Sequence, residues 1–265
     1  MEQPLPLLQR REGAVLVLSN NNPAARNALS PAFYAALTES LAQAEADPTV
    51  GAIVLTGEGG HFCAGGDLRQ LAKRRELPVQ ERRAKLEGLH DLIRSVRDFP
   101  KPVIAAVEGA AAGAGLSLAL ACDMLVAAKN AVFSVAYVKV GLTPDGGATA
   151  FLAEFVSRQV LTELCLTGER ISGERLHALG PVNRLSEPGQ AQADAVALAA
   201  QVATGPDQAM ALIKDLCRQA PRNTLEEQLE LEAQYMVRSQ ESEESREGIG
   251  AFLEKRSADF TKLRG

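Results

Sequence analysis

Short apolar runs alternate with helical patterns through the first half of the chain, and this alternation constrains the fold more than any other feature. Each run is short, rich in aliphatic residues and bounded by glycine, proline or polar residues, as strands usually are. The expected strands are 13–20, 50–60, 102–109, 124–128 and 131–137. Apolar strands that are separated by helices are typical of a parallel sheet covered on both faces. The sequence therefore predicts an α/β fold with largely buried, parallel strands.

The segments between these strands have helical spacing. Ser30 and Pro31 are typical of a helix start, and Phe33, Leu37 and Leu41 follow at four-residue intervals. Further helices are expected at 86–99 and 110–123, and after the loop 61–68.

The pattern changes after Gly205, where three helical stretches follow one another without a strand. They cover 206–220, 224–239 and 244–255. We therefore divide the chain into a core, 1–204, and a helical region, 205–265, which is not expected to be independent because no flexible linker precedes it. Leu225, Leu229 and Met236 share one side of the middle helix with Glu232. The apolar residues on this side are expected to be buried, either against the core or against another subunit.

Charge and apolar content exclude several classes of function. The net charge is −5, with both signs interspersed, so neither nucleic acid nor a membrane surface is the expected partner. The most apolar stretch, 103–128, contains Glu108 and Asp123 and is too polar for a membrane span. The first residues resemble no targeting signal, and a cytoplasmic location is expected. The cysteines and histidines are scattered, so neither disulfides nor a metal site is predicted.

Two loops rich in small residues each lead into a helix: "FCAGGDL" (62–68) and "EGAAAGAGLSLA" (108–119). Backbone N–H groups at a helix start are unpaired, and small residues let a ligand approach them. Two such groups that converge on one oxygen would form an oxyanion hole. Phosphate binding and a plain structural turn are the alternatives, but neither loop matches a nucleotide-binding motif.

Several stretches, taken together, resemble the enoyl-CoA hydratase/isomerase, or crotonase, superfamily. They occur in the family's order between about residues 10 and 260, and their combination is far more specific than any one of them. They are "NNNPAARNALS", "GEGGHFCAGGDL", "FPKPVIAAVEGAAAGAGLSLALACDMLVAA", "FSVAYVKVGLTPDGGAT", "LTGERISGERLHALGPVNRL" and "EGIGAFLEKRSADF".

This resemblance implies a crotonase-like α/β fold, a spiral of ββα repeats whose helical C-terminal part builds homotrimers, often paired into hexamers. It implies an acyl-CoA thioester as substrate and no separate cofactor. The thioester oxygen would be held by the backbone N–H groups of Gly66 and Ala114. The positions matched to the coenzyme A arm are Arg26, Ala28, Ala64 and Leu68. Gly65, Asp67, Gly113, Ser117 and Tyr137 complete the substrate-binding set, with Phe252 and Lys255 as a tail pair that can reach coenzyme A. Asp67 is also expected to cap the helix that follows it.

The sequence departs from the resembling hydratases at the two glutamates that hold water in those enzymes. The first position is occupied by Ser117 and the second by Tyr137. Neither is a carboxylate, and an ordinary tyrosine is mostly protonated at neutral pH. Hydration by the usual two-glutamate route is therefore not predicted.

Asp145, in "GLTPDGG", is the carboxylate that remains. This loop resembles the branch of the family that moves double bonds or opens rings, including the isomerases that act on ring-epoxide thioesters of the phenylacetate pathway. One base that reaches both carbons suffices to move a proton between them. We expect Val135, Val140 and Leu142 to surround Asp145 with apolar side chains. The alternative is that Asp145 only caps a helix beginning near Gly147.

Three other functions stay open from the sequence. An atypical hydratase would hold water with Asp145 and Tyr137. A dehalogenase of the chlorobenzoyl-CoA type would use Asp145 as nucleophile and His90 as base, although the chain has no tryptophan at the position where those enzymes carry one. A non-catalytic acyl-CoA-binding protein would bind the thioester without turnover.

Overall fold

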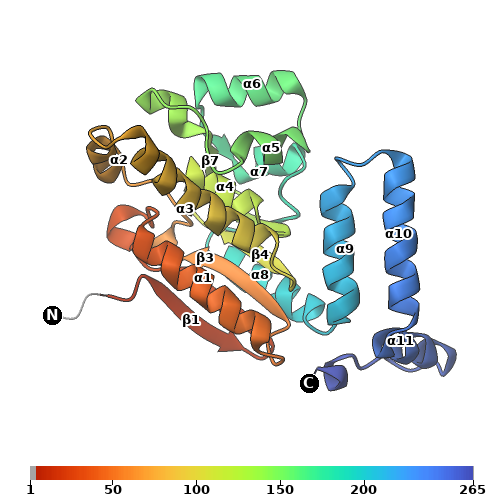
Figure 1. Ribbon diagram of the computed structural model, residues 1–265. Coiled ribbons are helices and arrows are strands. Elements are labelled where there is room, and N and C mark those ends of the chain that lie inside the picture. The colour runs from red at the N-terminus through yellow and green to blue at the C-terminus, as the bar shows by residue number, and fades with distance from the viewer. Residues whose placement is uncertain (1–3, 265) are drawn as a thin grey trace.

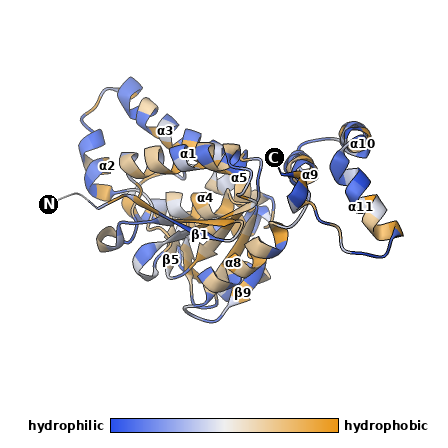
Figure 2. Ribbon diagram, turned by 90° about the horizontal axis from the view of Figure 1, so that it is seen from below, coloured by the Kyte–Doolittle hydropathy of each residue, from blue (hydrophilic) through white to orange (hydrophobic). Residues whose placement is uncertain are grey.

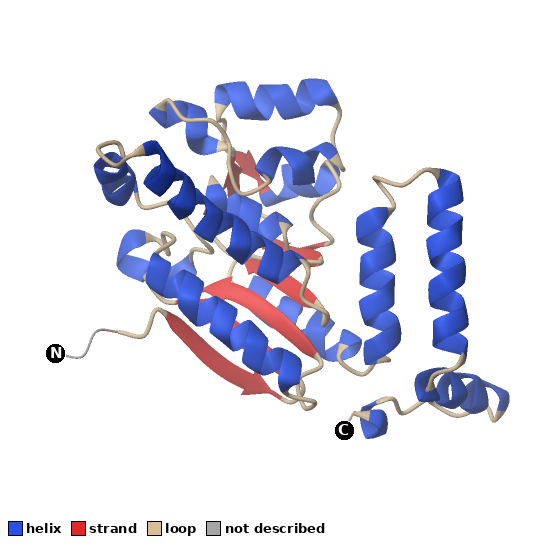
Figure 3. Cartoon of the chain, in the orientation of Figure 1, coloured by secondary structure: helices blue, strands red, loops and turns tan. Residues whose placement is uncertain are grey.

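The computed structural model describes residues 4–264, and its centre is a six-stranded sheet (Figure 1; Figure 3). The strand order is β1-β2-β3-β4-β6-β9. Only β1 runs antiparallel to its neighbour, and the other pairs are parallel, as predicted. The strands are β1 (Leu7–Glu12), β2 (Val15–Asn20), β3 (Ala52–Gly57), β4 (Val103–Val107), β6 (Met124–Ala128) and β9 (Arg184–Ser186).

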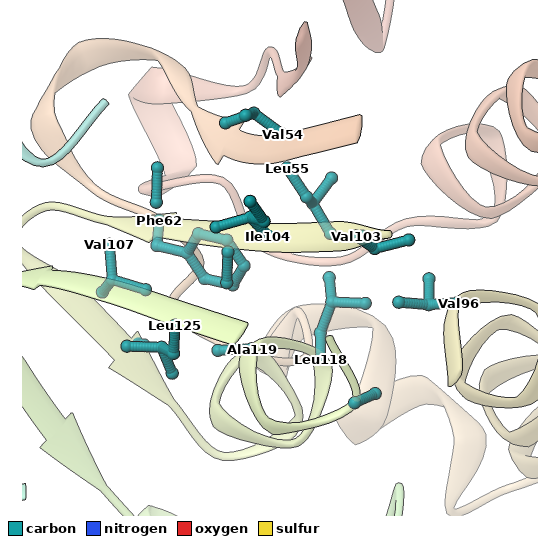
Figure 4. Packing of buried hydrophobic residues seen from close by; sticks show 14 of the residues in the cluster. Val54, Leu55, Phe62, Val96, Val103, Ile104, Val107, Leu118, Ala119 and Leu125 are labelled. Atoms are coloured by element: carbon teal, nitrogen blue, oxygen red, sulfur yellow. The ribbon is translucent and has the colours of Figure 1, made fainter. Parts of the chain in front are cut away.

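Helices cover both faces of this sheet. Figure 2 shows α1 (Pro31–Ala46) and α3 (Val79–Arg97) on one side and α8 (Ala191–Val202) on the other. Every residue of β2 and β4 is buried, which explains why β4 is apolar throughout and β2 is apolar except for Ser19 and Asn20 at its end. Figure 4 shows Leu55, Val103 and Leu118 packed together in the core between sheet and helices. Burying each such side chain contributes about 1.5–3 kcal/mol.

A second, three-stranded sheet has the order β5-β7-β8. Its strands are β5 (Ala110–Ala112), β7 (Val132–Ser134) and β8 (Ile171–Ser172). The remaining helices of the core are α2 (Leu68–Arg74), α4 (Ala114–Leu120), α5 (Ala148–Ala153), α6 (Arg158–Thr167) and α7 (Gly173–Ala178). None of the helices in residues 4–264 is long and apolar enough to span a membrane.

Two local predictions were wrong. The stretch 110–123 is not one helix, because Gly113 has φ 53° and ψ −128°, a conformation that side chains exclude, and it separates β5 from α4. The expected strand 131–137 ends at Ser134, where pairing with β5 ends, and a 3₁₀ helix, Ala136–Val140, follows. Tyr137 therefore lies on a helical turn rather than in a strand.

The C-terminal region is helical, as predicted, and lies beside the core (Figure 1). It contains α9 (Asp207–Gln219), α10 (Leu225–Gln240) and α11 (Glu243–Leu253). The predicted apolar side of α10 is not covered by the core: Leu225, Leu229 and Met236 are all exposed. Cover by another subunit, the division at residue 204 and the trimer or hexamer stay predictions.

Candidate active site

The two loops rich in small residues are joined by backbone hydrogen bonds. The Cys63 N–H donates to the carbonyl of Ala110 (2.9 Å), and the Ala112 N–H donates to the carbonyl of Cys63 (3.0 Å). Gly65, with φ +93°, faces β5 so closely that a Cβ atom there would lie 2.6 Å from the carbonyl oxygen of Ala112. Such an atom would also lie 3.5 Å from the nitrogen of Ala114. The fold therefore requires glycine at this contact and brings the two candidate donor loops together.

Both candidate donors are free. Within residues 4–264, neither the N–H of Gly66 nor that of Ala114 donates a hydrogen bond. Ala114 is the first residue of α4, where an N–H has no acceptor in its own helix. Two free N–H groups on adjoining loops can hold an oxygen that gains negative charge during a reaction.

Asp145 is held by Tyr137 and Ser117, the two residues that the family resemblance matches to the glutamates of hydratases. The Tyr137 hydroxyl donates to Asp145 Oδ1 (2.7 Å) and also lies 3.2 Å from the carbonyl oxygen of Asp145. The Ser117 hydroxyl donates to the same carbonyl oxygen (3.0 Å). Gly146, with φ +61°, lets this turn approach α4, because a Cβ atom there would lie 3.0 Å from that of Ser117. The other carboxylate oxygen, Oδ2, has no hydrogen-bond partner within the described chain.

The structure excludes the alternative of Asp145 as a helix cap, and it shows the expected apolar surroundings only in part. The side chain of Asp145 does not cap α5, because the N-cap residue is Gly147 and no side chain bonds to the helix start there. Val135 is buried, but Val140 and Leu142 are 49% and 47% exposed. Asp145 itself is half-buried. One side of the carboxylate is therefore fixed by Tyr137, and the apolar enclosure is only partial.

Tyr137 is a protonated donor in this pair. Burial raises the pKa of its hydroxyl, and the negative charge and hydrogen bond of Asp145 raise this pKa further. Its ring also lies beside the loop 108–119, since a Cβ atom on Gly113 in that loop would come within 3.7 Å of the ring. Tyr137 thus connects the donor loops with Asp145.

Replacing Tyr137 with phenylalanine is expected to lower kcat about tenfold, because a hydrogen bond to a charged group contributes about 1.5–3 kcal/mol. KM should change little, because the ring still fills its place beside Gly113. Steady-state kinetics, with the thioester that the wild-type protein turns over fastest, measures both kcat and KM. Tyr235→Phe is the matched control, since Tyr235 makes the same kind of bond to Asp215 (2.6 Å) in the C-terminal region. Equal kcat in the two variants would contradict a role for the Tyr137 hydroxyl.

The positions matched to the coenzyme A arm lie on two adjacent segments. The Ala64 N–H donates to the carbonyl of Arg26 (2.9 Å), and the Leu29 N–H donates to that of Gly65 (2.8 Å). Arg26 and Leu68 are exposed, whereas Ala28 is buried. As predicted, Asp67 caps α2 by accepting from the N–H of Arg69 (2.9 Å).

The tail pair lies elsewhere in the chain. Phe252 is 82% exposed on α11 and Lys255 follows that helix, and Figures 1 and 2 both place α11 beyond α9 and α10, away from α4 and α5. One chain alone therefore does not bring this pair to the loops around Gly66.

His90 lies on α3, and its Nδ1 is 3.6 Å from a carboxylate oxygen of Glu87.

Sequence reasoning missed Tyr34 and Arg74. Tyr34 is half-buried in the first turn of α1, and its burial raises the pKa of its hydroxyl to about 12. The positive charge of Arg74 lowers this pKa, and the charges of Cys63 and Asp145 raise it. No motif contains either residue, and the spacing of apolar residues along α1 does not mark Tyr34 as functional. Cys63 is buried in the core, and this burial raises the pKa of its thiol to about 12.

Comparisons of the sequence and of the structure with known proteins all indicate the same family. A family model described as enoyl-CoA hydratase/isomerase matches residues 10–263. The 1,2-epoxyphenylacetyl-CoA isomerase of Escherichia coli is 38% identical over 256 residues, covering 96% of this chain and 98% of that protein. The 2,3-dehydroadipyl-CoA hydratase of the same organism is 34% identical over 255 residues, covering 96% and 98%. A crystal structure of an enoyl-CoA hydratase from Polaromonas sp. JS666 superposes with a TM-score of 0.93 at 48% identity, covering 96% of this chain and 98% of that one. This likeness confirms the predicted crotonase-like α/β fold.

Proposed function

Because the chain belongs to the enoyl-CoA hydratase/isomerase family, we propose that it isomerises an acyl-CoA thioester, moving a double bond or opening a ring, with Asp145 as the acid–base. The observation that carries this proposal is the hydrogen-bonding around Asp145. Ser117 and Tyr137 stand where a hydratase needs two carboxylates, and both bind Asp145 instead. The site thus has one candidate base, which is what a proton shuttle between two carbons requires.

In this mechanism, the thioester carbonyl oxygen accepts hydrogen bonds from the N–H groups of Gly66 and Ala114. Removal of a proton from Cα places negative charge on that oxygen as an enolate. The two donors stabilise the enolate more than the neutral carbonyl, and this difference lowers the barrier. Each such donor is typically responsible for a factor of about 10²–10³ in rate.

Asp145 moves the proton. For a 3-enoyl thioester, Oδ2 takes the proton from Cα, and the C–H electron pair becomes part of a dienolate that extends to Cγ. The protonated carboxyl group then returns the proton to Cγ, which leaves the double bond between Cα and Cβ. Tyr137 keeps Oδ1 in place through both steps, so that only Oδ2 exchanges the proton. No water is consumed.

Hydration is the second candidate function, favoured by the hydrogen-bonded pair of Asp145 and Tyr137. A carboxylate and a phenol together can position one water molecule. The name of the relative that is a 2,3-dehydroadipyl-CoA hydratase agrees with this reaction, whereas that of the 1,2-epoxyphenylacetyl-CoA isomerase agrees with the first. The substrate contacts of Arg26, Ala28, Ala64 and Leu68, and those of Phe252 and Lys255 toward a neighbouring subunit, belong to the proposal for either reaction.

Proton exchange distinguishes the two reactions. The protein is incubated in D₂O with a 3-enoyl-CoA and, separately, with crotonyl-CoA, and the products are analysed by mass spectrometry. We expect double-bond migration from the first substrate, with deuterium at Cα and Cγ and no addition of water. Addition of water to crotonyl-CoA without migration in the other thioester would overturn isomerisation in favour of hydration.

A further inference from the structure

His61 lies where the two candidate donor loops, 62–68 and 108–119, begin to run side by side. Its ring atom Nδ1 accepts a hydrogen bond from the N–H of Ala110 (3.1 Å), the first residue of β5. Gly109, with φ +53°, allows this contact, because a Cβ atom there would lie 2.5 Å from His61 Nδ1 and 2.2 Å from the carbonyl oxygen of Gly60. The half-buried imidazole therefore lies directly against the residues that lead into β5.

The ring takes the place of a main-chain acceptor. In a regular parallel ladder, the N–H of Ala110 would bond to a carbonyl of the neighbouring segment. The carbonyl of His61 instead accepts from the side chain of Asn27 (2.6 Å), which is fully buried. The carbonyl of Ala110 accepts the N–H of Cys63 (2.9 Å). Both backbone groups of Ala110 are thus held by the segment around Cys63, one of them through the His61 side chain.

The direction of this hydrogen bond fixes the state of the imidazole. A main-chain N–H can only donate, so Nδ1 is an unprotonated acceptor and the proton of the neutral ring lies on Nε2. An apolar side chain at this position would take the acceptor away from the N–H of Ala110, and a backbone donor that loses its partner inside a protein is costly. The loss would occur four residues before Ala114 and five residues before Gly66.

We propose that His61 is a positioning residue for the candidate oxyanion hole formed by Gly66 and Ala114. The inference rests on the proposed acyl-CoA function, because it concerns the same hole. Two donors stabilise one oxygen only when their separation and direction are fixed before the charge develops. His61 holds the start of one donor loop against the start of the other, and it acts through the main chain rather than by contact with the substrate. Its removal should therefore affect the rate more than binding.

The test compares two substitutions at this position. His61→Leu removes the acceptor, whereas His61→Asn keeps one, because asparagine Oδ1 has the same position relative to Cβ as histidine Nδ1. We expect His61→Leu to lower kcat for double-bond migration about tenfold or more, toward the factor of about 10²–10³ that loss of a whole donor costs. KM should change little, and His61→Asn should stay close to the wild type.

His177→Leu is the matched control. The Nδ1 atom of His177 also bonds to the main chain, at the carbonyl of Val182 (2.7 Å), but this contact lies outside both donor loops. Its loss should leave kcat unchanged. A thermal melt of each variant confirms that it is folded. If His61→Leu does not fold, His61→Gln replaces it, because glutamine stays polar but carries its acceptor one carbon further from the main chain.

A second readout reports on the hole without turnover. Each protein is saturated with hexanoyl-CoA that carries ¹³C at the thioester carbonyl, and the C=O stretching frequency is measured by infrared difference spectroscopy. Hydrogen bonds from two fixed donors lower this frequency. We expect the full shift in the wild type, His61→Asn and His177→Leu, and loss of most of it in His61→Leu. A loss of stability alone would not change the carbonyl frequency in the folded, saturated protein.

Two results would overturn the inference while the hole itself stands. One is an unchanged carbonyl frequency in folded His61→Leu, and the other is an equal loss in His61→Leu and His61→Asn. The absence of any shift in the wild type would overturn the hole and the inference together. Failure of the proposed reaction looks different: a protein that shifts the carbonyl frequency only when His61 is present, but moves no double bond, keeps the positioning role and loses the isomerase assignment.

Discussion

Replacing Asp145 with asparagine is expected to lower kcat for double-bond migration by about 10³-fold, within the range that a positioned acid–base contributes. Asparagine has the same shape and still offers Oδ1 as an acceptor to Tyr137, so the loop should keep its conformation. The amide cannot take a proton from Cα. Rates on a 3-enoyl-CoA, together with the affinity for a saturated thioester, separate loss of chemistry from loss of binding.

The matched control for this change is Asp91→Asn, which removes a carboxylate from the exposed side of α3. Its kcat should stay within about twofold of the wild type, as surface substitutions usually have small effects. If Asp145→Asn retained more than a tenth of the wild-type kcat, Asp145 would not be the acid–base, and the hydroxyl groups near it would have to be reconsidered.

Replacing Lys214 with methionine is expected to lower the free energy of unfolding by about 3 kcal/mol, because it leaves a largely buried carboxylate without its partner. Lys214 Nζ lies 2.7 Å from a carboxylate oxygen of Asp123, with side chains that are only 15% and 22% exposed. The same ammonium donates to the carbonyls of Phe99 (2.6 Å) and Lys101 (2.7 Å). Burial lowers the pKa of Lys214 and raises that of Asp123, whereas their mutual attraction opposes both changes.

Urea denaturation of the variant measures this loss. Arg246→Met is the control, because Arg246 pairs with Glu243 on an exposed helix face, where a pair contributes about 0–1 kcal/mol. Adding Asp123→Asn to Lys214→Met should recover part of the stability, since it removes the unpaired charge. If the single variant were as stable as Arg246→Met, the ion pair would not be what holds α9 against Asp123, the residue that precedes β6.

The architecture was predictable because it follows from periodicity. Apolar runs without alternation indicated buried parallel strands, and the three C-terminal helices were evident from their spacing. The errors came from single residues with special backbone conformations. Gly113 divides a stretch that is uniformly small and apolar, so that nothing in its composition marks the boundary between β5 and α4.

The candidate site was predictable only where a motif exists. The family pattern pointed to Asp145, Ser117 and Tyr137 as separate positions, but their hydrogen bonds depend on the 3₁₀ helix that turns Tyr137 back toward Asp145. Tyr34 and Arg74 carry no pattern at all. The bridge between Leu29 and Gly66 joins the starts of the helices that carry them, a long-range contact that one sequence does not reveal.

The pairing of the Cys63 loop with β5 has a consequence for how such a protein can acquire new chemistry. Both candidate oxygen-binding groups are main-chain N–H groups that follow closely after one hydrogen-bonded pair of segments, so point mutations that exchange side chains elsewhere leave them in place. In the proposed mechanism, the residues that decide the fate of the enolate are, by contrast, side chains at 117, 137 and 145. A lineage can therefore alter the reaction by changing a few codons while it inherits the stabilisation of the shared intermediate intact.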